Sequence, residues 1–137
     1  MNVKRVGNVI LAVKDIEKSL YFYHEIIGMP IKNQRRTWID LGVSGALLSL
    51  HPASLTAKHI GSSIENGITI GFLVGDVKSA VEELKAKGVE IHRDIVEKDA
   101  GKNVVIRDPD DYLISLFEPS FTDKTVQTSG YYGFTPV

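Results

Sequence analysis

The sequence contains no cysteine. This absence excludes a disulfide framework, a thiolate nucleophile, a zinc finger and an iron–sulfur cluster. An excess of charge of one sign is also missing, since 16 Lys and Arg stand against 17 Asp and Glu and give a net charge of -1. This balance provides no general electrostatic field for nucleic acid or a membrane surface. With 43% hydrophobic and 24% charged residues among 137, the composition is that of a globular protein with its own core.

Long hydrophobic runs are absent as well. The longest apolar run near the start, residues 9–13, is far too short to span a bilayer. Asp15 and Glu17 follow at once, and no cleavage-site pattern accompanies the run, so we do not interpret it as a signal peptide. We therefore expect a cytoplasmic protein whose partners include neither nucleic acid nor a membrane.

The charges are unevenly distributed along the chain. Residues 1–64 carry a net charge of +4, and residues 65–137 carry a net charge of -5. Two interpretations stay open at this point. The two halves present solvated surfaces that happen to differ, or they attract each other within one chain or across a dimer.

Two segments of the sequence resemble each other. Residues 8–16 and 69–77 are each a run of strand length that reaches an Asp, at Asp15 and Asp76. Asp is a strong helix N-cap, because its carboxylate accepts hydrogen bonds from the free N–H groups of the first turn. Apolar residues then recur with the period of a helix. The predicted stripes are Ile16, Leu20, Tyr23 and Ile27 in the first helix and Val77, Val81 and Leu84 in the second.

The two predicted helices also end alike. Gly28 and Gly88 stand where a left-handed C-terminal cap is expected. Three further strands follow each helix. The predicted ranges are about 31–35, 37–41 and 47–52 in the first repeat, and about 90–95, 103–107 and 113–119 in the second.

The sequence therefore predicts an α+β fold of two tandem βαβββ modules that form curved mixed sheets with a cleft. Each module alone has about 50 residues, which is too few for a firm core, so the two must pack together. We expect one domain over residues 1–137. Its parts are module 1 at about 1–52, a linker at about 53–67, module 2 at about 68–119 and a C-terminal tail at 120–137.

Alternation along the matched strands separates two faces of the predicted sheets. One face holds only large apolar side chains and is expected to lie under the helices. The other, which we call the mixed face, combines small, polar and apolar residues, and we expect it to line a cleft with open space at Ser49 and Ser115. The mixed face comprises Asn8, Ile10, Ala12, Leu47, Ser49, His51, Thr69, Gly71, Leu73, Leu113, Ser115 and Phe117.

Trp38, the single tryptophan, shares a strand face with Asp40. A flat aromatic ring beside a carboxylate suits a planar or cationic ligand, although packing of Trp38 in the core or at a subunit contact is an alternative. His51 has the parity of Ser49 and is a candidate for a hydrogen bond or proton transfer to a ligand. The candidate ligand-binding residues are Asn8, Trp38, Ser49, His51, Thr69, Ser115 and Phe117.

The tail at 120–137 holds four of the eleven aromatic residues. We expect it to pack on the body, on a partner subunit or over the mouth of a cleft.

The duplicated unit, its helix starts at Asp15 and Asp76, and the Asp-Pro-Asp-Asp-Tyr turn at 108–112 together form a recognisable pattern. Over about residues 5–119 the chain resembles the vicinal-oxygen-chelate superfamily, which includes glyoxalase I, extradiol dioxygenases and bleomycin-resistance proteins. That family usually has Gly after Asp-Pro-Asp. Here the residue is Asp111, which tolerates a left-handed backbone better than most residues do.

The resemblance implies a metal position. In metal-using members, His, Gln or Glu from the first and last strand of each module hold one divalent ion. The corresponding residues of this chain are Asn8, Ser49, Thr69 and Ser115, none of which is a carboxylate or an imidazole. We therefore expect no metal and no cofactor.

Three functions stay open. The leading interpretation is a metal-free protein that binds a small molecule and acts by sequestration or metal-independent handling of it. The first alternative is a lyase, isomerase or dioxygenase-type enzyme with a displaced or absent metal site, and the second is a scaffold with a vestigial cleft. Since family members commonly pair modules within a chain or across a dimer, we also expect a homodimer.

Overall fold

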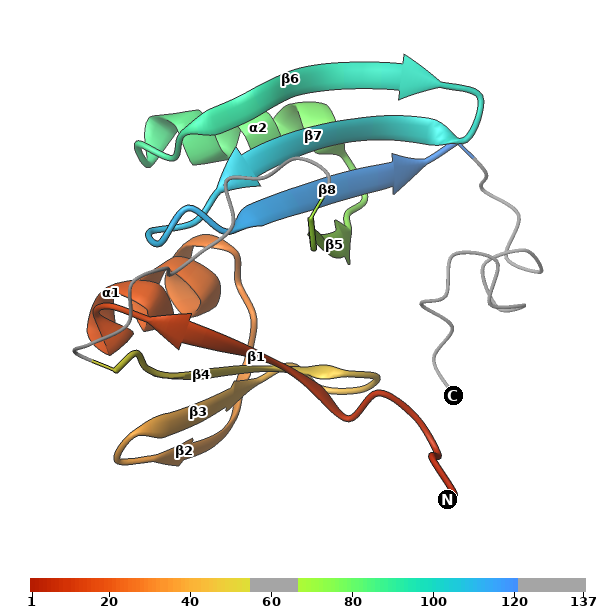
Figure 1. Cartoon of the computed structure of the whole chain (residues 1–137). Coiled ribbons are helices and arrows are strands. Elements are labelled where there is room, and N and C mark those ends of the chain that lie inside the picture. Colours follow the sequence, from red (N-terminus) through yellow and green to blue (C-terminus); the bar gives the residue numbers. More distant parts are fainter. Residues whose placement is uncertain (55–66, 121–137) are drawn as a thin grey trace. The chain divides into compact units, whose positions relative to one another are not determined.

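The computed structural model describes residues 1–54 and 67–120. The chain divides into two compact units, and their described parts are module 1 (residues 1–54) and module 2 (residues 67–120). Each is a four-stranded mixed sheet with a helical segment that follows its first strand (Figure 1). This confirms the predicted α+β fold with two βαβββ modules. The expected packing of the aromatic tail concerns residues outside the described ranges. No helix of the described ranges is long and apolar enough to cross a membrane.

Module 1 builds its sheet in the strand order β1-β4-β3-β2. Strands β1 and β4 are parallel, and the other neighbours are antiparallel. The elements are β1 (Asn8–Val13), α1 (Ile16–Leu20), the π-helical segment η1 (Tyr21–Ile26), β2 (Ile31–Arg35), β3 (Trp38–Leu41) and β4 (Leu47–Pro52).

Module 2 repeats this topology in the order β5-β8-β7-β6, again with its first and last strands parallel. Its β6–β7 hairpin is longer than the sequence predicts, because the two strands stay paired up to Lys98 and Gly101. The elements are β5 (Ile70–Leu73), α2 (Val77–Ala86), β6 (Ile91–Lys98), β7 (Gly101–Arg107) and β8 (Leu113–Pro119).

The local signals for helix ends are confirmed. The carboxylate of Asp15 accepts hydrogen bonds from two backbone N–H groups of the first turn, at 3.1 and 3.2 Å. Asp76 caps α2 through one such bond of 3.0 Å. Gly28 and Gly88 take the left-handed backbone, with φ of 94° and 78°. Both helical segments therefore begin after an Asp N-cap and end before a left-handed Gly, as the sequence predicts.

The first helix differs from the prediction in its second half. The sequence predicts one regular helix through residue 27, but the chain changes to a π-helical segment after Leu20, where the N–H of Ile27 donates to the carbonyl of Phe22 at 2.9 Å. Ser19, Phe22 and Tyr23 form its buried stripe, and Leu20 is only half-buried. The wider turns change which side chains face the sheet.

The helix-facing side of each sheet forms the core. Its side chains on β4 and β8 and those of Leu11 and Val13 on β1 are almost completely buried, as the alternation predicts, whereas Val9 of β1 and the helix-facing side chains of β5 are half-buried. β1 and β5 are both edge strands, and each is paired on one side only within its sheet. The buried members are Leu11, Val13, Leu48, Leu50, Ile114 and Leu116.

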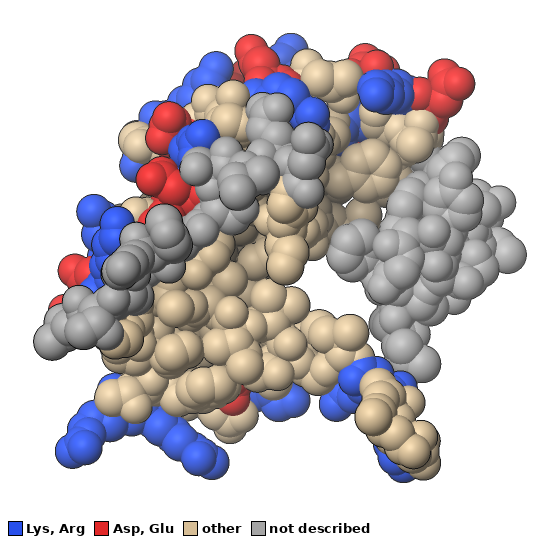
Figure 2. All heavy atoms as spheres, in the orientation of Figure 1, with Lys and Arg blue, Asp and Glu red and all other residues tan. Residues whose placement is uncertain are grey.

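The surface charges differ between the modules. In Figure 2 the visible face of module 1 is mainly uncharged, with Lys and Arg along its periphery, whereas Lys and Arg alternate with Asp and Glu on module 2. The acidic excess of the second half of the sequence is therefore not gathered into one patch on this face.

Candidate ligand-binding site

The mixed face of module 1 carries a hydrogen-bonded cluster centred on Asp40 of β3. One carboxylate oxygen of Asp40 accepts from the hydroxyl of Ser49 at 2.6 Å and from the indole N–H of Trp38 at 2.8 Å. The other oxygen accepts from the side-chain amide of Asn33 at 3.3 Å. The pairing of β3 with β4 places Asp40 directly opposite Ser49. Sheet register therefore assembles the cluster from three strands.

Two further predicted residues join this cluster, which we call the Asp40 cluster. The amide nitrogen of Asn8 donates to the hydroxyl oxygen of Ser49 at 3.1 Å. The ring of His51 stacks on Trp38, with 5.7 Å between ring centroids and 14° between ring planes. The structure thus brings together four of the seven candidate residues, namely Asn8, Trp38, Ser49 and His51.

The carboxylate of Asp40 is held in its charged form. The hydrogen bond from Ser49 is the largest influence that lowers its pKa, and those from Trp38 and Asn33 act in the same direction. Partial burial opposes them but does not prevail. The cluster therefore places a fixed negative charge beside a stacked aromatic pair, which is an arrangement suited to a planar group with a positive charge or hydrogen-bond donors.

The prediction of open space at Ser49 is wrong. Ser49 is completely buried, with 0% of its surface exposed. Its hydroxyl lies between Asp40 and Asn8, whose side chains occupy the space that the sequence assigns to a cleft. Ser49 therefore supports the cluster from beneath. Ser115, the matching residue of module 2, is only half-buried.

Module 2 contains a hollow of about 270 Å³ on its own mixed face. Two candidate residues, Thr69 and Ser115, contribute to its wall. The third candidate of this module, Phe117, lies on β8 beyond Ser115, opposite Asn103 of β7, and is not part of the lining. The lining residues are Thr69, His92, Arg93, Asn103, Val105, Leu113 and Ser115.

Three polar side chains of the hollow are connected in series. The guanidinium of Arg93 donates to the side-chain oxygen of Asn103. The amide nitrogen of Asn103 donates to the hydroxyl of Ser115 and also to the carbonyl of Leu116, the latter at 3.3 Å. Asn103 therefore fixes the positions of its two neighbours on either side.

Sequence reasoning overlooked several of these residues for different reasons. Asn103 and Val105 alternate with the buried Val104 and Ile106, so period-2 reading of this strand would have placed them on the mixed face. His92 and Arg93 are neighbours in the chain and yet both line the hollow. The register of β6 shifts between residues 91 and 93, and such a bulge breaks the alternation in a way that the sequence does not signal.

Other titratable side chains have structural partners. A ring nitrogen of His24 lies 2.6 Å from the carbonyl of Met29, at the end of the first helix. The carboxylate of Glu118 accepts from the backbone N–H of Val77 at 2.8 Å and so helps to cap α2. Neither side chain is therefore positioned to complete a site on the mixed face.

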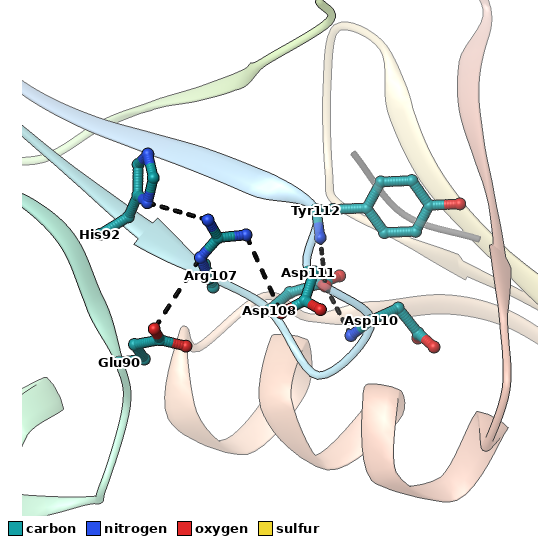
Figure 3. Close-up of polar contacts among 7 residues, drawn as sticks. All are labelled: Glu90, His92, Arg107, Asp108, Asp110, Asp111 and Tyr112. Atoms are coloured by element: carbon teal, nitrogen blue, oxygen red, sulfur yellow. Dashed lines mark hydrogen bonds and ion pairs between the residues drawn. The ribbon is translucent and has the colours of Figure 1, made fainter. Parts of the chain in front are cut away.

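The turn at residues 108–112 forms as predicted. The carboxylate of Asp108 accepts from the backbone N–H groups of Asp110 and Tyr112 at 2.8 and 2.9 Å (Figure 3). Asp111 takes the left-handed backbone with φ of 66°. The carboxylate of Asp108 and the left-handed backbone of Asp111 therefore shape the turn.

A sequence model of the glyoxalase/bleomycin resistance protein/dioxygenase superfamily matches residues 5–116. The chain belongs to this superfamily. An Arabidopsis thaliana lactoylglutathione lyase is 29% identical over 126 residues, which cover 84% of this chain and 44% of that protein. A probable lactoylglutathione lyase of Vibrio parahaemolyticus is 28% identical over 131 residues, which cover 86% and 93%. The chain spans about half the length, or less, of the plant and yeast relatives that it matches.

Solved structures share the fold. TnmS3, an antibiotic-binding protein from Streptomyces, superposes with a TM-score of 0.69 at 21% identity and covers 88% of this chain and 99% of its own. A superfamily protein from Nocardioides has a TM-score of 0.66 at 16% identity, with coverage of 90% and 88%. These similarities show that the helices and strands of this chain are arranged as in those two proteins.

The residues at the superfamily's metal position do not fit a divalent ion. Asn8 and Ser49 direct their polar atoms at each other and at Asp40, and Thr69 and Ser115 are neutral hydroxyls. A catalytic divalent ion needs carboxylate or imidazole ligands, or several oxygen ligands. Across residues 1–54 and 67–120, no three His, Asp or Glu side chains gather in a way that would hold a metal ion.

Proposed function

We propose that this superfamily member binds a small molecule on its mixed faces without the divalent ion, and sequesters it or handles it by metal-independent chemistry. The observation that carries the proposal is the state of the metal position, where Asn8 and Ser49 are committed to the Asp40 cluster. The antibiotic-binding activity named for TnmS3, a protein of the same fold, supports a binding role.

The Asp40 cluster gives the ligand two recognisable surfaces. The stacked rings of Trp38 and His51 offer an aromatic plane, and the ionised carboxylate of Asp40 offers a charged acceptor beside it. Fixed aromatic rings lose little conformational entropy when they contact a ligand. We therefore propose that the ligand's planar part lies on this face.

The test combines metal analysis with ligand identification. Elemental analysis of tag-free protein should show well under one divalent ion per chain, and mass spectrometry of the native protein should reveal a copurifying small molecule. Adding that molecule should change the fluorescence of Trp38, the only tryptophan, and a Trp38→Phe variant provides the blank. Stoichiometric zinc, nickel, manganese or iron that a chelator removes together with an activity would contradict the proposal.

The enzyme alternative is favoured by the relatives named lactoylglutathione lyase. Under this alternative, purified protein should show lactoylglutathione lyase activity, either alone or with added zinc or nickel. A His51→Ala variant tests whether a displaced site depends on that imidazole. Activity in the wild type that this variant lacks would favour the enzyme, and absence of activity under all conditions favours binding.

We also propose that the two modules form one domain and that the chain assembles as a homodimer. The edge strands β1 and β5 carry exposed apolar side chains on their mixed faces, with Ile10 51% and Leu73 45% exposed. Unpaired strand edges and apolar side chains favour association. Sedimentation at micromolar concentration should give twice the chain mass of 15.1 kDa, and a species of only the single mass would contradict the dimer. The cytoplasmic location stays a prediction from the sequence.

A further inference from the structure

We propose that the hollow of module 2 binds an oxyanion, namely a carboxylate or phosphoryl group of a small ligand. This inference rests on the proposed function, because it assigns a chemical class to a ligand of the mixed face. Its basis is the chemistry of the lining, the direction of the hydrogen bonds within it and the size of the space.

The lining offers positive charge and no negative charge. Arg93 contributes a guanidinium, and neither Asp nor Glu is among the seven lining residues. The other polar members are two hydroxyls, one amide and one imidazole, each of which can donate a hydrogen bond. A cationic ligand would find no carboxylate here, whereas an oxyanion would find several donors.

The direction of the internal hydrogen bonds favours the same class of ligand. Arg93 donates to the side-chain oxygen of Asn103, so the acceptor of that amide already faces a cation. Asn103 in turn donates to the oxygen of Ser115. The hydroxyl of Ser115 thus accepts within the lining and has its proton to donate. With these bonds formed, the guanidinium of Arg93 and the hydroxyl of Ser115 are the groups that can donate hydrogen bonds to a ligand in the hollow.

The tautomer of His92 is set by Arg107. A guanidinium nitrogen of Arg107 lies 3.1 Å from Nδ1 of His92 (Figure 3). Because arginine stays protonated and can only donate, Nδ1 must accept and the ring proton resides on Nε2. Arg107 is itself 17% exposed and lies 3.9 Å from carboxylates of both Glu90 and Asp111, which hold it in place. Arg107 is thus a positioning residue for His92.

The size of the hollow limits the ligand. At about 270 Å³, it lies just below the usual size of ligand pockets, which span roughly 300–1,000 Å³. The buried side chains of Val105 and Leu113 supply an apolar wall. The space therefore suits an oxyanion group on a short hydrocarbon body, with the planar guanidinium matched to two oxygens of the anion.

The experiment is a titration of the full-length protein followed by NMR at constant ionic strength. The probes are methylphosphonate, acetate and, as the cationic control, tetramethylammonium. At least one anion should shift the signals of the Arg93 and Asn103 side chains and of the Ser115 amide saturably, with a Kd on the order of millimolar. Tetramethylammonium should leave these signals in place. The ratio of the two anion affinities tells a phosphoryl from a carboxylate site.

Two variants with the same change of charge separate a site from a general field effect. Arg93→Gln removes the guanidinium of the hollow and should weaken anion binding at least tenfold. Lys98→Gln removes a positive charge from an exposed residue of the same strand, outside the lining, and should change the affinity less than twofold. Arg93→Lys keeps the charge without the planar fork and should bind with intermediate affinity.

Three results would overturn the inference: no shift at the hollow with either anion, an equal loss of affinity in both Gln variants, or a stronger response to tetramethylammonium. The proposed function is judged separately by copurifying ligand and by Trp38 fluorescence in module 1. A neutral or cationic molecule that binds at Trp38 while both anions fail would refute only this inference. Anion binding at the hollow without any copurifying ligand would leave it standing while the proposed function fails.

Discussion

Replacing the two matched serines by leucine should destabilise the protein strongly at one position and only slightly at the other. Ser49 is completely buried and donates to the ionised Asp40 at 2.6 Å. Ser49→Leu removes a hydrogen bond to a charged group, worth about 1.5–3 kcal/mol, and overpacks the site at a cost of about 1–3 kcal/mol. We expect the free energy of unfolding to fall by about 3–5 kcal/mol in Ser49→Leu. In Ser49→Ala it should fall only by the contribution of the hydrogen bond.

Ser115→Leu should be mild, because Ser115 is half-buried beside the hollow of about 270 Å³. It loses one neutral hydrogen bond, worth about 0.5–1.5 kcal/mol. Asn103 keeps its bond to the carbonyl of Leu116, and the new side chain gains apolar contact with Val105 and Leu113. The net loss should stay under about 1 kcal/mol.

Thermal denaturation followed by circular dichroism measures both variants. At about 4 °C per kcal/mol for a chain of this size, Ser49→Leu should lower the Tm by about 12–20 °C and Ser115→Leu by less than about 4 °C. Urea denaturation at 25 °C provides the independent free energy of unfolding. Equal losses in the two variants, or a larger loss for Ser115→Leu, would refute the assignment of one buried and one open serine.

Three further changes have defined outcomes. Folding lowers the pKa of Asp40, so the ionised carboxylate stabilises the fold above the unfolded pKa of about 3.9, and this stabilisation is lost as the pH falls through the folded value. Urea denaturation at pH 6 and pH 3 should therefore show a smaller drop in the free energy of unfolding for Asp40→Asn than for the wild type. Gly101→Ala would place a Cβ against the carbonyl oxygen of Glu118 and should lower the free energy of unfolding by about 2–4 kcal/mol. The control is Gly75→Ala, whose Cβ would meet nothing within 4 Å and should change stability by less than about 1 kcal/mol. Similar melting curves for the two variants would contradict this prediction. His51→Ala removes the ring stacked on Trp38 and should change the intensity of its fluorescence, whereas an unchanged spectrum would mean that the rings do not stack in solution.

Local signals predicted the parts of the fold that depend on neighbouring residues in the chain. The caps at Asp15 and Asp76, the left-handed Gly28 and Gly88, and the buried parity of Leu50 all follow from the chemistry of a few consecutive residues. Interactions of this kind need no knowledge of sheet register. They were therefore readable from the sequence.

The candidate site was less accessible to such reasoning. Asp40 and Ser49 are nine residues apart, and their hydrogen bond exists because β3 and β4 pair in one register. Alternation assigns Ser49 to a face but gives no information on how deeply it is buried. The sequence could therefore indicate which face carries the site, whereas which serine is open depends on the size of the side chains across the strands.

Because of the bulge in β6, the chemistry of the hollow depends on the number of residues in this strand. In a regular strand only alternate residues face one side, so His92 and Arg93 could not both reach the hollow. Deleting His92, the one residue between Ile91 and Arg93, would remove this irregularity together with the imidazole and leave the guanidinium of Arg93 at the hollow, while β7 and β8 kept their pairing. Single-codon insertions and deletions thus give diverging gene copies a route to a new ligand preference that leaves the apolar core of the module untouched.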